Sequence, residues 1–198
     1  MMKEVIIATK NAGKAKEFEH IFNQYNIAVK SLLDFEDVED IVEDGETFEA
    51  NALIKARAIA KQFNQVVIAD DSGLEVDALD GRPGVYSARY AGEGRDDQAN
   101  IEKVLSELEG IPTNQRGARF VCALALVTPE GKESVVRGTC EGQIFTECLG
   151  SEGFGYDPIF YLPELEKTMA QIPKNQKNVL SHRADAFTKL QDVLMTLV

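Results

Sequence analysis

Two neighbouring carboxylates, Asp70 and Asp71, follow the apolar run 66–69 and precede Ser72 and Gly73. The apolar run predicts a buried strand, and α/β sheets place ligand-contacting groups at the carboxyl ends of such strands. Adjacent carboxylates repel one another unless a cation lies beside them. Because Mg²⁺ is held by one or two carboxylates together with substrate phosphates, this pair indicates a magnesium site. A turn with a capping aspartate and a glycine at positive φ is the alternative interpretation.

Glu43 is the acid that we expect to join this pair as a distant metal ligand. It lies just before Gly45 and a predicted helix over 47–63, within the stretch 34–49, which is rich in Asp and Glu and has no Lys or Arg. The other acids of this stretch indicate a solvated loop.

A second candidate segment lies between a predicted strand at 5–8 and the helix that follows it. It consists of Thr9, Lys10, Asn11, Ala12, Gly13 and Lys14. Free backbone N–H groups and the positive end of the helix dipole make such a junction an anion site. Lys14 in the first helical turn is unfavourable by roughly 0.3 kcal/mol, and a bound phosphate would reverse that sign. The segment lacks the spacing of a Walker A loop, and a capping loop with a surface lysine is the alternative.

A third candidate group combines a glycine-flanked aromatic loop with basic residues further along the chain. A planar base could stack on Phe154, a contact worth about 1–3 kcal/mol in single-strand binding. The basic residues offer hydrogen-bond donors to a base carbonyl or to phosphates, although aromatics that fold back on the core and surface cations would give the same pattern. The group contains Phe154, Gly155, Tyr156, Asp157, Lys177, His182 and Arg183.

The elements that must position these groups follow from hydrophobic periodicity. Helices are predicted at 18–25, 47–63, 97–108 and 187–197, and strands at 5–8 and 66–69. A hairpin is predicted from the runs 118–128 and 133–145, and an apolar run at 158–161 follows a glycine-rich loop. Helices that alternate with strands and then a hairpin predict a mixed α/β chain, with the ligand in a cleft between an N-terminal half and a hairpin-bearing half.

Composition narrows the class of protein. The chain has 198 residues, 44% of them hydrophobic, which fits one globular domain over 1–198. A net charge of −12 argues against a nucleic-acid surface but leaves room for a small phosphorylated ligand. We expect the three cysteines to be reduced packing residues. No run has the length of a signal segment or a membrane span, so we expect a cytoplasmic protein.

Taken in order along the chain, the motifs resemble those of the inosine triphosphate pyrophosphatase family, and more closely its bacterial XTP/dITP diphosphatase branch. The resemblance covers nearly the whole sequence, although many relatives carry a glycine at the position of Lys10. The motifs are TKNAGK from Thr9, EDGETFEANALIKA around Glu43, ADDSGL from Ala69, PGVYSARY from Pro83, FGYDP from Phe154 and SHR from Ser181.

The resemblance implies a two-lobed α/β fold around a long mixed sheet, with the substrate cleft between the lobes, and a homodimer. It also implies Mg²⁺-dependent attack of water on deaminated purine nucleoside triphosphates (dITP, ITP and XTP), with pyrophosphate leaving. By this resemblance Glu43 and Asp71 bind the metal, Asp71 also activates the water, and Ser72 contacts the substrate. The segment 9–14 would hold phosphates, and the third group would form the nucleotide pocket.

The implied chemistry agrees with the residue types. Phosphoryl-type displacement depends on positioning and charge stabilisation, so no covalent nucleophile is required. Donors aimed at a 6-oxo group would reject adenine, because its amino group would leave them unpaired. Guanine shares the 6-oxo group, and we expect space or polarity near the 2-position to exclude it. A pyrophosphatase for a modified pyrimidine nucleotide and a nucleotide-binding sensor without turnover are the alternatives, and a nucleic-acid-binding module is third.

Overall fold

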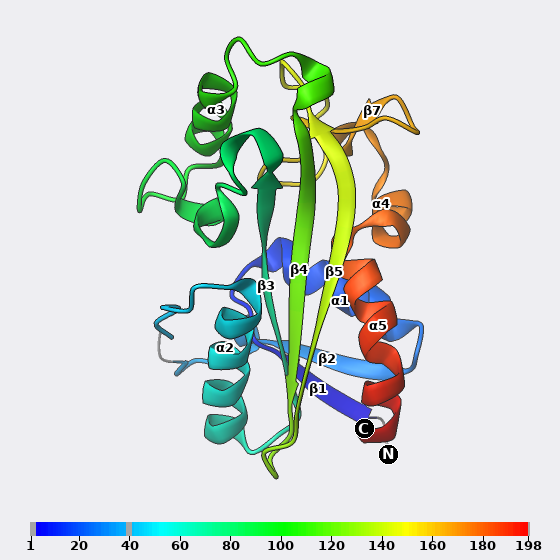
Figure 1. Ribbon diagram of the computed structural model, residues 1–198. Coiled ribbons are helices and arrows are strands. Elements are labelled where there is room, and N and C mark those ends of the chain that lie inside the picture. The colour runs from blue at the N-terminus through cyan, green and yellow to red at the C-terminus, as the bar shows by residue number, and fades with distance from the viewer. Residues whose placement is uncertain (1–2, 39–40, 198) are drawn as a thin grey trace. The chain divides into compact units, whose positions relative to one another are not determined.

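The computed structural model describes residues 3–38 and 41–197 (Figure 1), with the side chains of residues 3, 192 and 195–197 outside the described part. The elements in chain order are β1 (Lys3–Ile7), α1 (Ala12–Asn23), β2 (Ile27–Ser31), α2 (Phe48–Phe63), β3 (Val67–Val76), α3 (Asp97–Glu107), β4 (Gly117–Val127), β5 (Glu133–Ile144), β6 (Phe160–Leu162), β7 (Lys167–Thr168), α4 (Lys174–Leu180) and α5 (His182–Leu197). A 3₁₀ helix, η3 (Gly84–Arg89), lies between β3 and α3.

The strands of the described residues form one mixed seven-stranded sheet in the order β2-β1-β3-β4-β5-β6-β7. β1 pairs in parallel with β2 and with β3, so that Val5 lies opposite Val29 and Ile6 opposite Val67. β5 pairs antiparallel with β6, and β6 with β7. The predicted α/β class with a mixed sheet is therefore confirmed.

The chain divides into two compact units. Unit 1 comprises Met1–Asp71, Cys122–Gly138 and Arg183–Val198, and unit 2 comprises Ser72–Val121 and Thr139–His182. β3, β4 and β5 each contribute residues to both units. A single domain over 1–198 with a substrate cleft between two lobes stays a prediction.

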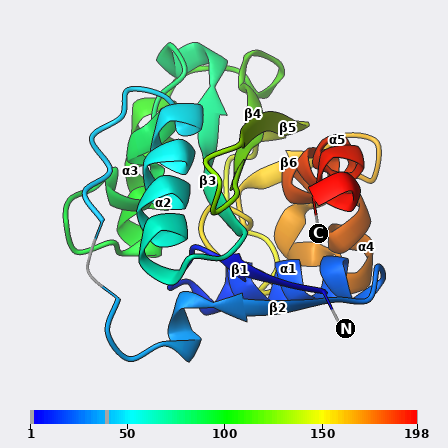
Figure 2. The same cartoon turned by 90° about the horizontal axis from the view of Figure 1, so that it is seen from below.

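Unit 1 has a hydrophobic core of its own, formed by its strands with α1 and α5. Side chains of α1 and α5, among them Phe18, Phe22 and Phe187, pack with Val5 and Ile7 of β1. α2 buries one stripe of its own surface. Figure 2 shows α2 and α5 on opposite sides of β3, β4 and β5. This arrangement follows from the pleat, because successive strand residues face opposite sides of a sheet.

Unit 2 has a second core. Buried residues of β3 and α3, including Leu74, Ile101 and Val104, pack with Tyr156 and Phe160 from the segment around β6. The aromatic loop that sequence reasoning singled out is thus attached to the core through Tyr156.

Several predicted elements are confirmed and some are corrected. The helix at 47–63, the hairpin and the final helix are confirmed within a few residues, with the side chain of Leu197 outside the described part. β2 and α4 were not predicted. The strand predicted at 66–69 was too short, because β3 continues to Val76 through Asp70 and Asp71. The turn interpretation of Asp70–Gly73 is therefore wrong.

Candidate functional site

The junction between β1 and α1 is a capped helix start. Asn11 is the N-cap of α1, and its Oδ1 accepts from the backbone N–H groups of Gly13 at 2.9 Å and Lys14 at 3.1 Å. The buried Thr9 accepts through Oγ1 from the Asn11 N–H at 3.1 Å. The expectation of free N–H donors here needs correction, because asparagine is a favoured N-cap and takes two of them.

Lys14 is paired within the protein. Its Nζ donates to Asp70 Oδ1, and Asp70 is 1% exposed. A carboxylate therefore already offsets the unfavourable position of this lysine in the first turn, so that position does not by itself indicate a phosphate. Lys10 is exposed and donates from Nζ to the carbonyl of Val38 at 3.3 Å.

Asp70 is the centre of a buried charge network in unit 1. The Arg183 Nε lies 3.3 Å from Asp70 Oδ2, and its Nη1 donates to Glu17 Oε2 at 2.9 Å. Cys122 donates from Sγ to Asp70 Oδ2 at 3.0 Å. Burial alone would lower the pKa of the Arg183 guanidinium, but Asp70 and Glu17 outweigh burial and hold that pKa above its ordinary value. The structure thus brings Arg183 together with Lys14, through Asp70.

Asp71 has a different set of neighbours. Lys55 Nζ lies 2.8 Å from Glu43 Oε2 and 3.4 Å from Asp71 Oδ1, so one ammonium joins the two predicted metal ligands. Burial lowers the pKa of Lys55, but Asp71 and Glu43 together raise it above its ordinary value. The geometry therefore brings Glu43 and Asp71 into one group, with Lys55 between them, and their role as metal ligands stays a prediction.

Sequence reasoning missed Lys55, although a signal for it exists. Phe48, Ala52 and Ile59 form the buried stripe of α2, and Lys55 lies on the same stripe at helical spacing. Its side chain is 11% exposed. A lysine on an apolar face requires acidic partners, and the carboxylates before and after the helix supply them.

The donor set suits a magnesium ion. Asp71 Oδ2 is buried and has no hydrogen-bond partner among the described residues, so it offers an unused oxygen next to Glu43. The described residues contain no group of three or more His, Cys, Asp or Glu side chains that could hold a metal by themselves. Mg²⁺ fits such a site, because it commonly takes one or two carboxylates and completes its shell with phosphates and water.

The burial of Asp71 predicts a pH effect on stability. Burial raises the pKa of its carboxyl above the ordinary 3.8, while Lys55 and Lys14 oppose the rise. Between pH 3.8 and the raised pKa the folded chain binds more protons than the unfolded chain, so this group contributes stability that is lost as the pH rises. In EDTA, wild type should therefore lose stability relative to Asp71→Asn as the pH rises above 3.8. Thermal unfolding of both proteins checks this, and a difference in Tm that does not change with pH would contradict it.

The predicted nucleotide-binding residues of unit 2 form a second group. Lys177 is 6% exposed, and its Nζ donates to Asp157 Oδ2 at 2.6 Å. The same Nζ lies 4.7 Å from the centre of the Phe154 ring. His182 is buried and stacks on Phe120, with ring centres 5.1 Å apart. Phe154, Asp157 and Lys177 are thus brought together, as the sequence predicted.

Glycine is required at Gly153, which opens the aromatic loop. Its φ is +80°, and a Cβ at this position would collide with the Asp157 carboxylate and lie 3.2 Å from Lys177 Nζ. Tyr156 is buried and donates from its hydroxyl to the carbonyl of Ser87 at 2.7 Å. Ser72 is half-buried in β3, next in the chain to Asp71.

The three cysteines differ in their exposure. All three cysteines are free, but Cys148 is exposed, so the expectation of three packing residues is wrong.

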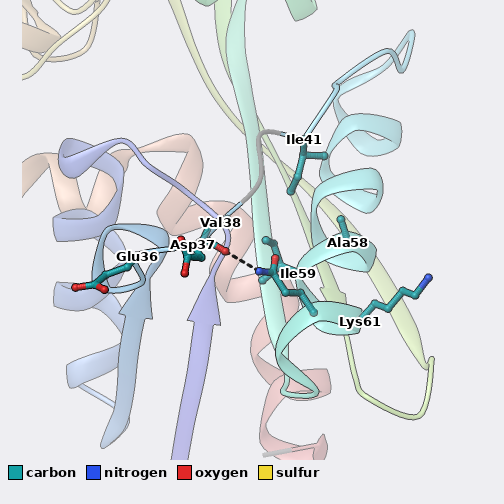
Figure 3. A pocket seen from close by; sticks show the side chains of 8 residues that line it. Glu36, Asp37, Val38, Ile41, Ala58, Ile59 and Lys61 are labelled. Atoms are coloured by element: carbon teal, nitrogen blue, oxygen red, sulfur yellow. Dashed lines mark hydrogen bonds between the residues drawn. The ribbon is translucent and has the colours of Figure 1, made fainter.

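A pocket of about 880 Å³ lies in unit 1 (Figure 3), where Gln62 of α2 donates to the carbonyl of Asp37 at 2.9 Å. The described residues that line this pocket include none of the predicted site residues. No helix in the described part of the chain is both long and apolar enough to cross a membrane.

The family model described as the Ham1 family matches residues 5–193. The chain belongs to the Ham1 family. This match confirms the family resemblance drawn from the motifs. The Ham1 chain is 56% identical over 193 residues to a dITP/XTP pyrophosphatase of Bacillus cereus, a match that covers 96% of this chain and 94% of the relative. It is 57% identical over 194 residues to a dITP/XTP pyrophosphatase of Bacillus subtilis, with 98% of each chain covered.

A solved structure agrees with the family assignment. The Ham1 protein of Staphylococcus aureus is similar with a TM-score of 0.87 and 47% identity, over 99% of this chain and 100% of that one. The fold described above is therefore the fold of this Ham1 relative.

Proposed function

We propose that this protein is a nucleoside triphosphate pyrophosphatase that converts dITP, ITP and XTP to the monophosphate and pyrophosphate. The observation that carries the proposal is the Glu43–Lys55–Asp71 group, in which two carboxylates converge on one ammonium and Asp71 keeps a buried unused oxygen. Relatives with more than half of their residues identical to this chain are named dITP/XTP pyrophosphatases, which supports the substrate class.

The residues of unit 1 would hold the triphosphate and the metal. Glu43 and Asp71 bind Mg²⁺, which supplies charge neutralisation for the phosphates when bound. Asp71 accepts the proton of the attacking water through its carboxylate. The new bond forms between the water oxygen and the α-phosphorus, and the bond from the α-phosphorus to the bridging oxygen breaks. The electron pair of that bond leaves with pyrophosphate.

The remaining predicted residues would bind the nucleotide. Lys14 and the segment 9–13 contact the phosphates, and Arg183 and Ser72 contribute further contacts. Phe154 stacks on the base, and Lys177 and His182 donate to oxygens of the base or the phosphates. Donors aimed at the 6-oxo group select against adenine, since an amino group there leaves a donor unpaired.

The test of this function is product analysis with dITP in the presence of Mg²⁺, and again in EDTA. We expect dIMP and pyrophosphate in equal amounts with Mg²⁺ and neither product in EDTA. Release of orthophosphate and dIDP would overturn the proposal, because it would place the attack on the γ-phosphorus. Tight binding of dITP without any product would favour a nucleotide sensor.

We also propose that the enzyme is a homodimer and works in the cytoplasm on free nucleotides. Tyr86 in η3 is 59% exposed, and the Arg89 guanidinium lies 5.3 Å from the centre of its ring, which is an arrangement suited to a contact surface. Tyr86→Glu should shift the protein from dimer to monomer in light scattering, because a carboxylate would be desolvated at the interface. A monomeric wild type would contradict the homodimer, and an unchanged dimer in the variant would remove Tyr86 from its interface.

A further inference from the structure

The peptide that carries Phe154 is fixed within its own loop. The Phe154 N–H donates to Asp157 Oδ2 at 3.0 Å, and the Phe154 carbonyl accepts from the Asp157 N–H at 3.3 Å. Gly153 and Gly155 on either side both have positive φ, at +80° and +60°. The loop therefore depends on hydrogen bonds to hold a backbone path that its glycines leave intrinsically flexible.

A contact from outside the loop completes this set. The Gly155 N–H donates to Asp97 Oδ2 at 2.8 Å, across 58 residues of sequence. Asp97 is the first residue of α3. The next peptide after Phe154 is thus held by a charged acceptor, which makes a stronger hydrogen bond than a neutral one.

Asp97 is not needed to cap its own helix. The neighbouring Asp96 is the N-cap of α3, and its Oδ1 accepts from the N–H groups of Gln98 at 2.9 Å and Ala99 at 3.1 Å. The two adjacent aspartates therefore have different partners. Asp96 caps the N-terminus of α3, and Asp97 accepts a hydrogen bond from the aromatic loop.

α3 provides a firm support for this contact. Asn100 is buried, and its Oδ1 accepts from the Ala91 N–H at 2.6 Å while its Nδ2 donates to the Ala88 carbonyl at 3.3 Å. Ile101 and Val104 of the same helix lie in the core of unit 2. Because the helix is fixed at its first turn, the backbone that carries Asp97 is held in place.

We propose that Asp97 is a positioning residue for recognition of the purine base. By holding the Gly155 N–H, it fixes the peptide after Phe154 and keeps the ring above Lys177, where the base would stack. This inference rests on the proposed function, and it assigns Asp97 to substrate binding rather than to the chemical step. Asp71, which the proposed function places at the reacting phosphate, belongs to the other unit.

The experiment compares Asp97→Ala, Asp97→Asn and Asp96→Ala with wild type, using dITP and Mg²⁺. Asp97→Ala should raise KM about tenfold, as expected for loss of a hydrogen bond to a charged group, and change kcat less than about twofold. Asp97→Asn keeps an oxygen acceptor and should restore KM to near the wild-type value. Asp96→Ala should lower Tm through loss of the cap and leave KM unchanged.

Three outcomes would overturn the role of Asp97. They are an unchanged KM in Asp97→Ala, an equal rise in KM in Asp96→Ala, and a failure of Asp97→Asn to restore KM. A wild type that releases no pyrophosphate would overturn the proposed function. The role of Asp97 in binding would then be tested by calorimetric dissociation constants for dITP, compared between wild type and the same three variants. Absence of dITP binding by wild type would overturn both proposals.

Discussion

Replacement of Asp71 by asparagine is expected to lower kcat for dITP by about 10³-fold, within the range that a positioned base contributes. Asparagine retains the shape of the side chain but cannot accept the proton of the attacking water, and it is a weaker metal ligand. Pyrophosphate release in Mg²⁺ measures the effect. The fold should be retained, because Lys55 keeps its 2.8 Å contact with Glu43.

The matched control is Asp44→Asn, which makes the same chemical change at an exposed aspartate of the neighbouring acidic stretch. Its kcat should equal that of wild type. If Asp71→Asn retained more than about a tenth of the wild-type kcat, Asp71 could not be the base.

Replacement of Asp70 by asparagine is expected to act on stability. The free energy of unfolding should fall by about 3–5 kcal/mol, since loss of one partner leaves buried charges uncompensated. Lys14 and Arg183 would lose their shared carboxylate, and the Arg183 side chain is 3% exposed. For a chain of this size that loss corresponds to a drop in Tm of roughly 6–20 °C, which calorimetry would detect.

Asp71→Asn serves as the control for Asp70→Asn, because the substitution is the same and the positions are adjacent. In EDTA, Asp71→Asn should leave Tm unchanged or raise it near neutral pH, since burial disfavours the charged form of Asp71. Equal losses of Tm in the two variants would show that the two carboxylates do not have separate roles.

The separation of the two aspartates was not accessible from sequence. Consecutive residues of a strand face opposite sides of the sheet, so Asp70 and Asp71 have different neighbours. The sequence predicted that the strand ends at residue 69, and a turn was the alternative interpretation because Asp-Asp-Ser-Gly is typical of turns. Lys14 and Lys55 are the partners of Asp70 and Asp71, and they allow β3 to continue through both aspartates. Both lysines are remote from the aspartates in sequence, and only the fold shows that they lie close to them.

Elements with strong periodicity were predicted well. The stripe of α2 and the apolar run of β4 placed both within about a residue of their observed bounds. β2 was missed because only its first and last residues, Ile27 and Ser31, are buried, which leaves little pattern in a five-residue strand.

The candidate site was predicted in part, because some of its residues lie in recognisable sequence patterns and others do not. Motifs indicated Glu43, Asp71 and Phe154, and the basic residues near the final helix indicated Lys177. Lys55 was missed because the sequence was searched for acids before and after α2 rather than for a cation on its buried face. The capping role of Asn11 was also missed, although the preference of asparagine for the N-cap position indicated that its side chain would accept from N–H groups of the first turn.

The most direct test of the central claim is pyrophosphate release from dITP, XTP, dGTP and dATP at equal concentration with Mg²⁺. Base-selective hydrolysis predicts rapid release from dITP and XTP, with little from dGTP or dATP, and loss of release in Asp71→Asn. Equal rates on all four nucleotides would contradict selection at the base.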